Sequence, residues 1–293
     1  MRHPIAVLLV LAVGVTVPEA ALGAPGGRFL LDNSRIGANC GESCEDTGPH
    51  PSSIFSMRAN GTAFRRLAMP CAGARCSWSQ PAPSPNGRTI ALPGLWLVNA
   101  NGANLRRVPG VEDDASEAAW SPGGRRLAFS CFWRLEGGAS QSDVCTIVPD
   151  GSRFRRLTMT GGGEPTWSPN GQIAFVRPVV YQGRPRLWTM PADGGGPARR
   201  LTDGWARDPS FSPGGSRIAY ECRGAICVVA ADGSGQRRLA RFGSSPAWSP
   251  NGRWIAYIGQ NGISRIRPDG SGRTRISPRS YPFANLAWTR VPR

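Results

Sequence analysis

The sequence predicts an all-β fold made of many short strands, and three observations lead to this prediction. Gly and Pro are abundant, with 38 and 27 of the 293 residues, and only 18% of the residues are charged. This composition is typical of short strands joined by tight turns. A second observation is a recurring pattern, as in PAWSPNGRWIAY at 246–257 and AAWSPGGRRLAF at 118–129. The third is an Asn-Gly or Asp-Gly pair followed by a segment such as FRRL or QRRL, a combination that occurs six times.

The recurring pattern has the period of a propeller blade. The Ser-Pro pairs of this pattern begin at 84, 121, 168, 212 and 249, and Trp288-Thr289 is equivalent to Trp-Ser, so that the steps are 37, 47, 44, 37 and 40 residues. Each unit reads as a Trp-bearing strand, a Pro-x-Gly turn, a second strand such as WIAY, a third strand, a type I′ turn at Asx-Gly and an Arg-bearing fourth strand. Four antiparallel strands repeating at about 40–45 residues predict a six-bladed β-propeller.

The two ends of the chain predict how the ring closes. The C-terminal segment NLAWTRVPR (285–293) is a first strand without a second. The N-terminal segment GGRFLLDNSR (26–35) is a second strand without a first. We therefore expect Phe29–Leu31 to pair with the strand that holds Trp288, because closure removes an exposed sheet edge.

The repeat WSPNGRWIAY…VVAADGSGQRRL resembles that of TolB-like six-bladed propellers, over essentially all of the chain after residue 23. The resemblance implies the propeller fold. Two departures limit what else it implies. The family's Ser-Pro-Asp-Gly turn is Ser-Pro-Asn-Gly or Ser-Pro-Gly-Gly here, and we expect no counterpart of the N-terminal α/β domain of TolB, so the role of TolB in the Tol–Pal system is not expected to carry over directly.

The first 23 residues are typical of a signal peptide. Arg2 gives a positive start, Ile5–Val17 is an uncharged apolar run too short to span a bilayer, and Ala21-Leu22-Gly23 offers small residues for cleavage. We therefore expect residues 24–293 to form the propeller outside the cytoplasm, whether periplasmic, wall-associated or secreted, and to be monomeric.

Blade connectivity predicts two unlike faces. The short Pro-x-Gly and Asx-Gly turns share one face, here called the turn face. The second-to-third strand connections and the links between blades share the other, the loop face, which receives the long insertions. Variable loops on a rigid scaffold are where binding residues gather, and aromatic and Arg side chains anchor interfaces. The predicted binding residues are Trp78, Phe132, Trp133, Arg134, Tyr181, Arg184, Trp205, Arg207, Tyr281 and Phe283.

Eight cysteines in an exported chain predict disulfides. Cys131 and Cys222 follow equivalent second strands, and Cys145 and Cys227 each precede an Asp-Gly turn by five positions, so we expect the bridges 131–145 and 222–227. Cys40 and Cys44, and Cys71 and Cys76, pair most simply as neighbours, although crossing between these pairs stays open. The cysteine spacing and the single remaining histidine, His50, argue against a zinc site.

The function indicated is a non-catalytic scaffold that binds a protein, peptide or glycan at the loop face, without a cofactor. The alternative is a polysaccharide lyase or hydrolase that uses loop-face carboxylates, because paired acids can cleave glycosides or hold Ca²⁺, with Asp113 and Asp114 as weak Ca²⁺ candidates. The formal net charge of +16 allows non-specific attraction to an anionic cell surface, whereas export argues against nucleic acid.

Overall fold

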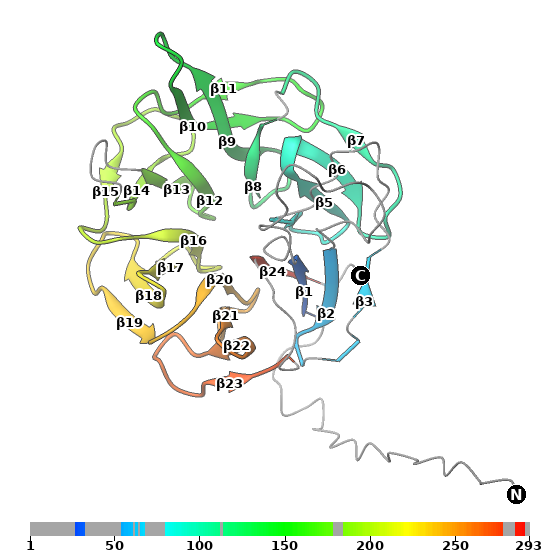
Figure 1. Cartoon of the computed structure of the whole chain (residues 1–293), viewed down its shortest axis with the longest axis vertical. Coiled ribbons are helices and arrows are strands. Elements are labelled where there is room, and N and C mark those ends of the chain that lie inside the picture. The colour runs from blue at the N-terminus through cyan, green and yellow to red at the C-terminus, as the bar shows by residue number, and fades with distance from the viewer. Residues whose placement is uncertain are drawn as a thin grey trace, which may run out of the picture.

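The protein is described by a computed structural model that places residues 27–32, 54–60, 62–63, 65–67, 80–111, 114–177, 184–277 and 285–290. These residues form four-stranded antiparallel sheets arranged in a ring (Figure 1). The predicted all-β propeller of four-stranded blades is therefore confirmed.

Within the described residues there are six such sheets, five of them built from four consecutive strands each. Their strands, from the innermost outward, are β4 (Ala82–Pro83), β5 (Thr89–Leu92), β6 (Trp96–Asn99) and β7 (Arg106–Arg107); β8 (Ser116–Trp120), β9 (Leu127–Arg134), β10 (Ser140–Ile147) and β11 (Arg155–Arg156); β12 (Gly163–Trp167), β13 (Gln172–Arg177), β14 (Arg186–Pro191) and β15 (Arg199–Arg200); β16 (Arg207–Phe211), β17 (Arg217–Cys222), β18 (Ala225–Ala230) and β19 (Arg237–Ala240); and β20 (Ser244–Trp248), β21 (Ile255–Gly259), β22 (Gly262–Ile266) and β23 (Thr274–Arg275). A short 3₁₀ turn, η3 (Pro93–Leu95), joins β5 to β6.

The closing sheet joins both ends of the chain. It combines β24 (Asn285–Arg290) with β1 (Gly27–Asp32), β2 (Ile54–Arg58) and β3 (Arg65–Arg66). β1 pairs antiparallel to β24 with Phe29 opposite Trp288, the closure predicted from the two unpaired ends. Hydrogen bonding between the first and last strands holds the ring shut without a covalent link.

The turn face owes its regular shape to two recurring turns. In the Ser-Pro-x-Gly turns the Gly has positive φ, for example 67° at Gly124 and 70° at Gly252. In the Asx-Gly turns the Asx side chain accepts the backbone N–H two residues on, as Asp150 does from Ser152 at 2.8 Å. Both are local devices that the sequence specifies directly, which explains why they repeat so faithfully.

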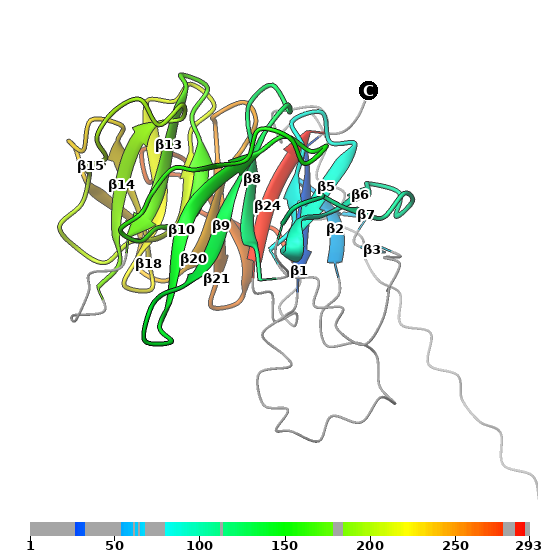
Figure 2. The same ribbon diagram turned by 90° about the horizontal axis from the view of Figure 1, so that it is seen from above.

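The loop face carries the longer excursions. Ser116 at the start of β8 is opposite Ser130, and β9 continues beyond it to a hairpin with β10. In the side view this hairpin projects downward past the ring, which identifies the lower side of the picture as the loop face (Figure 2).

Apolar side chains fill the spaces between neighbouring sheets. The recurring Trp residues lie there, as predicted: Trp120, Trp167 and Trp288 are half-buried, and Trp248 is buried in a cluster with Ile226 and Tyr257. The indoles also tie successive inner strands together, since Trp120 Nε1 donates to Ala82 O of the preceding sheet at 3.0 Å. Because each sheet packs on the next, the inner strands are held in register around the axis.

Candidate functional site

A ring of polar residues lines the mouth of the central channel on the loop face. All six inner strands contribute to a cavity of about 290 Å³ at the ring axis. Four residues before the Ser or Thr of each repeat pattern, every unit places a polar side chain on this cavity: Gln80, Glu117, Glu164, Asp208, Ser245 and Asn285. Three neighbouring members are acidic, which gives this part of the mouth a negative character despite the basic composition of the chain.

The backbone at this position has an uncommon conformation. Gln80, Glu117, Glu164, Asp208 and Ser245 all have positive φ, between 46° and 54°. Four of the inner strands have a register shift here, for example between Ser116 and Ala119 opposite β9. A bulge of this kind re-aims one side chain out of the regular alternation, and here it accompanies the polar member of each strand. Non-Gly residues adopt this conformation at a cost, and such costs concentrate at functional sites.

A hydrogen-bond relay joins the ring residues of successive blades. Glu117 Oε2 accepts from the backbone N–H of Glu164 at 2.8 Å. Glu164 Oε2 accepts from the backbone N–H of Asp208 at 2.6 Å, and Asp208 Oδ2 accepts from the backbone N–H and the hydroxyl of Ser245, each at 3.2 Å. Each carboxylate therefore holds the inner strand of the next blade in place, and the same hydrogen bond fixes the position of the carboxylate.

Glu164 is the most perturbed acid of the ring. Its side chain is 12% exposed. Burial raises the pKa of Glu164 to about 8, and repulsion from Asp208 and Glu117 adds to the rise. The backbone N–H of Asp208 and the guanidinium of Arg207, whose Nε lies 3.5 Å from Glu164 Oε1, act in the opposite direction. At neutral pH the central acid of the trio therefore holds a proton, which it can offer to an acceptor or release when a cation approaches.

Two predicted binding residues, Trp205 and Arg207, lie in the link to β16 and at the start of that strand, and a third, Arg184, lies in the connection between β13 and β14. Trp205 is half-buried in the link that precedes β16, and Arg207 is exposed at the start of β16 beside Asp208. Arg184 is exposed just before β14. The structure thus brings Arg207 to the acidic ring through its contact with Glu164.

Phe132, Trp133 and Arg134 belong to the protruding end of β9. Arg134 is exposed, whereas Phe132 and Trp133 are half-buried. The Trp133 ring packs against the core of the β8–β11 blade, and the guanidinium carbon of Arg156 lies 4.4 Å from its centroid. Trp133 therefore has a packing role within its own blade.

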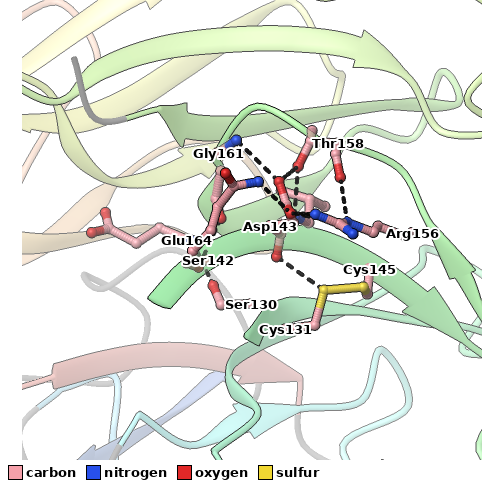
Figure 3. Close-up of a disulfide and its surroundings, with 12 residues drawn as sticks. Ser130, Cys131, Ser142, Asp143, Cys145, Arg156, Thr158, Gly161 and Glu164 are labelled. Atoms are coloured by element: carbon pink, nitrogen blue, oxygen red, sulfur yellow. Dashed lines mark hydrogen bonds and ion pairs between the residues drawn. A yellow bond between two sulfur atoms is a disulfide. The ribbon is translucent and has the colours of Figure 1, made fainter. Parts of the chain in front are cut away.

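The Arg156 that covers Trp133 is anchored by a buried carboxylate (Figure 3). Asp143 is fully buried and accepts from Arg156 Nε at 3.0 Å, from Thr158 Oγ1 at 2.8 Å and from the backbone N–H of Gly161 at 3.1 Å. Next to it, Sγ of Cys131 lies 3.3 Å from the carbonyl oxygen of Asp143. This network fixes the link between two blades and is closed to a ligand.

Both disulfides predicted from the register of equivalent strands are present. Cys131 is bonded to Cys145 and Cys222 to Cys227, each pair with Cα atoms 5.9 Å apart. Both bridges hold the second and third strands of their blades together beneath the loop-face connection.

Several predicted residues lie outside the part of the chain that the structure describes. They are Trp78, Tyr181, Tyr281, Phe283, Cys40, Cys44, Cys71, Cys76, His50 and Asp113. Asp114, the other Ca²⁺ candidate, is exposed. Among the described residues, no group of three or more His, Cys, Asp and Glu side chains is placed to hold a metal ion.

Two members of the acidic trio, Glu164 and Asp208, were not singled out from the sequence. The acids considered there, such as Asp113 and Asp114, are adjacent along the chain. Glu164 and Asp208 are isolated acids, 47 and 44 residues from the preceding member of the relay. Aligning the six repeats on their Ser-Pro pairs, rather than scanning for runs, would have exposed the polar column.

Similar proteins are known in sequence and in structure. The "Tol-Pal system protein TolB 1" of Novosphingobium aromaticivorans is 36% identical over 72 residues, which span 24% of this chain and 16% of that protein. The crystal structure of TolB from Acinetobacter baumannii superimposes with a TM-score of 0.66 at 18% identity, covering 90% of this chain and 66% of that one. A chain of a nidogen/laminin complex also gives a TM-score of 0.66 at 12% identity, covering 90% and 98%.

No helix in the described ranges is both long and apolar enough to span a membrane. The family model of the TolB beta propeller domain matches residues 92–291, which is more than half of the chain. This match agrees with the four-stranded blades around a central channel, and the chain accordingly belongs to the TolB β-propeller family.

Proposed function

We propose that this protein is an exported, non-catalytic propeller that binds a partner protein at its loop face, with a cationic segment of the partner seated at the channel mouth. The observation that carries the proposal is the relay of Glu117, Glu164 and Asp208 on the cavity at that mouth. Three neighbouring acids favour a Lys or Arg side chain, or an amino terminus, over an anionic or apolar group.

The surroundings of the mouth suit a protein partner. Arg207 lies 3.5 Å from Glu164, Trp205 lies two residues before it in the link to β16, and both are of the residue types that anchor interfaces. The loops of the same face provide further contact area beyond the cavity. A glycan remains the other ligand class that such aromatic residues could stack upon.

Export is supported by the two disulfides in the described residues and by the signal-peptide pattern of residues 1–23. A relative named as a Tol–Pal system protein agrees with an envelope setting. We therefore place the partner in the periplasm or at the cell surface.

The test uses as probe an oligolysine peptide that is acetylated at its N-terminus only, so that its lysine side chains stay charged. Its binding to residues 24–293 is measured by isothermal titration calorimetry. Glu117→Gln combined with Asp208→Asn should weaken binding at least about tenfold, equivalent to 1.4 kcal/mol. The matched control is Asp232→Asn combined with Asp269→Asn, which removes two acids from the turn face and should leave binding unchanged. Equal weakening in both double variants would show a general charge effect and sink the proposal, provided that both melt like the parent protein.

A second candidate function is polysaccharide cleavage, and the raised pKa of Glu164 favours it specifically. A protonated acid beside a second carboxylate is the pair of groups used in glycoside hydrolysis. Release of new chain ends from a polysaccharide, abolished by Glu164→Gln, would establish this activity in place of pure binding.

A further inference from the structure

The turn face carries a second, basic cavity that the proposed function does not use. It has a volume of about 1080 Å³ and lies where the β4–β7 and β8–β11 blades meet. Its charged lining consists of four arginines and one aspartate: Arg106, Arg125, Arg126, Arg153 and Asp150. Four positive charges and one negative leave a net charge of +3 around one cavity.

The preceding blade reaches across to hold one wall of this cavity. Arg106, on the outermost strand β7, donates from Nη1 to Pro149 O at 3.0 Å. Gly151 sits so close to Pro109 that a Cβ there would lie 2.9 Å from the Pro109 carbonyl oxygen. The hairpin that bears Arg153 is therefore fixed against the neighbouring blade rather than free to fold away from the other arginines.

The four guanidinium groups keep N–H donors that a ligand can use, because Arg106 spends only Nη1 on Pro149. Arg106, Arg125 and Arg153 are exposed and Arg126 is half-buried. None of the four forms an ion pair with a carboxylate within the part of the chain that the structure describes. Asp150 is committed to Ser152, whose hydrogen bonds lower the pKa of Asp150, with a smaller contribution from Arg153.

The equivalent place in the β20–β23 blade shows what the cavity replaces. The residue whose carbonyl accepts from the Ser of the Ser-Pro turn is Arg126 in one blade and Trp254 in the other. Trp254 packs against Gly272, with ring carbons 3.3 and 3.4 Å from a Cβ built there. The guanidinium carbon of Arg265 lies 4.3 Å from the centroid of the Trp254 ring. In the β8–β11 blade, arginines stand at both positions, since Arg153 occupies the place of Gly272.

Arg153 adopts this place against its own backbone preference. It has φ 54°, whereas the equivalent residues Gly235 and Gly272 have φ 62° and 66°. A glycine would be easier there, and two arginines that line one cavity repel each other unless an anion lies between them.

We propose that this arginine cavity binds a phosphate group, either on a soluble ester or on a lipid headgroup. Phosphate monoesters carry up to two negative charges and several acceptor oxygens, which match three or four guanidinium groups better than a single carboxylate does. The volume leaves room for the glycerol or sugar that carries the phosphate.

The experiment measures binding of glycerol phosphate by titration at about 0.15 M salt, where non-specific surface attraction is largely screened. In parallel, sedimentation compares vesicles of phosphatidylcholine with vesicles of phosphatidylcholine and phosphatidylglycerol in equal parts. Binding of glycerol phosphate assigns the site to soluble esters, and binding to the mixed vesicles alone assigns it to lipid headgroups. Failure of both, or stronger binding of polygalacturonate than of either, overturns the proposal.

The decisive variant is Arg126→Trp combined with Arg153→Gly, which rebuilds the packing of the β20–β23 blade. Because Trp254 and Gly272 already pack this way, we expect an unchanged or raised melting temperature and at least a tenfold loss of binding. The matched control, Arg217→Gln combined with Arg253→Gln, removes two turn-face arginines of other blades, at the repeat positions of Arg126 and Arg125, and should keep binding within twofold. Equal loss in the control, or full binding by the rebuilt variant, contradicts a defined site.

The two proposals fail independently. Glu117→Gln with Asp208→Asn alters the loop-face mouth and should leave phosphate binding intact. Loss of phosphate binding in that variant as well would show that the turn-face measurement reports on the whole fold, and it would contradict the assignment.

Discussion

The acids on the loop-face side and the arginines of the turn face both join neighbouring blades, but they do so in opposite environments. The Glu164 side chain is 12% exposed and accepts the backbone N–H of Asp208 in the next blade. Asp143 is fully buried and accepts the backbone N–H of Gly161 in the link to the next blade. Arg199 and Arg237 are exposed on outer strands and donate to carbonyl oxygens of the next blade's Asp-Gly turn.

The difference teaches that net charge describes this molecule poorly. A formal charge of +16 is spread over exposed arginines, where water screens it, whereas a few buried acids meet little screening. The acids should therefore dominate both the stability and the pH response of the ring, and the arginines should matter mainly where several converge on one cavity. Three predictions test this contrast.

The largest effect is expected at Asp143. Asp143→Ala removes an acceptor used by Arg156, Thr158 and Gly161 and leaves the Arg156 guanidinium without its carboxylate. We expect a loss of about 3–5 kcal/mol of unfolding free energy, measured by denaturant titration. Asp143→Asn, which keeps an acceptor oxygen, should lose less. A loss no greater than that of Asp150→Ala on the exposed turn face would refute the contrast.

The pH response should be controlled by Glu164. Its pKa rises from 4.5 to about 8 on folding, so the folded state binds a proton that the unfolded chain has released. This contribution is complete below pH 4.5 and is lost as the pH rises toward about 8, at up to about 1.4 kcal/mol per pH unit.

Glu164→Gln should therefore flatten the decline in melting temperature across that window. The exposed Asp150, Asp232 and Asp269 have lowered pKa values, mainly through hydrogen bonds from the serines two residues on, so their contributions change only at acid pH. A decline that persists unchanged in Glu164→Gln would place the titrating group elsewhere.

The repeats made most of the scaffold predictable, because each signal is local. Pro-x-Gly and Asx-Gly turns specify the hairpins, and the unpaired strands at the two ends require each other, as Phe29 opposite Trp288 bears out. The bridges Cys131–Cys145 and Cys222–Cys227 followed from the shared register of equivalent strands.

The sites were less predictable, because they depend on residues brought together by the ring. Glu117, Glu164 and Asp208 meet only when successive blades pack around one axis. Trp133 was predicted as a binding residue, and its packing contact with Arg156 was not foreseen, because it depends on pairing between β10 and β11. The fourth strands were predicted only to bear arginines, and the packing of the blades lets Arg199 and Arg237 reach the next blade.

The smallest effect is expected from these inter-blade arginine contacts. Arg199→Gln removes hydrogen bonds of 2.7 and 3.0 Å to Asp232 O and Ala231 O. Because both contacts are exposed, the two carbonyl oxygens can accept hydrogen bonds from water instead. We therefore expect a loss of about 1 kcal/mol or less, measured as a shift in the denaturation midpoint without a change in slope. Arg217→Gln, at a turn-face position that makes no such contact with the described residues, should be neutral by comparison. If Arg199→Gln instead matched Asp143→Ala, exposure would not separate the two kinds of contact, and the outer circumference would hold the ring closed as firmly as its buried acids do.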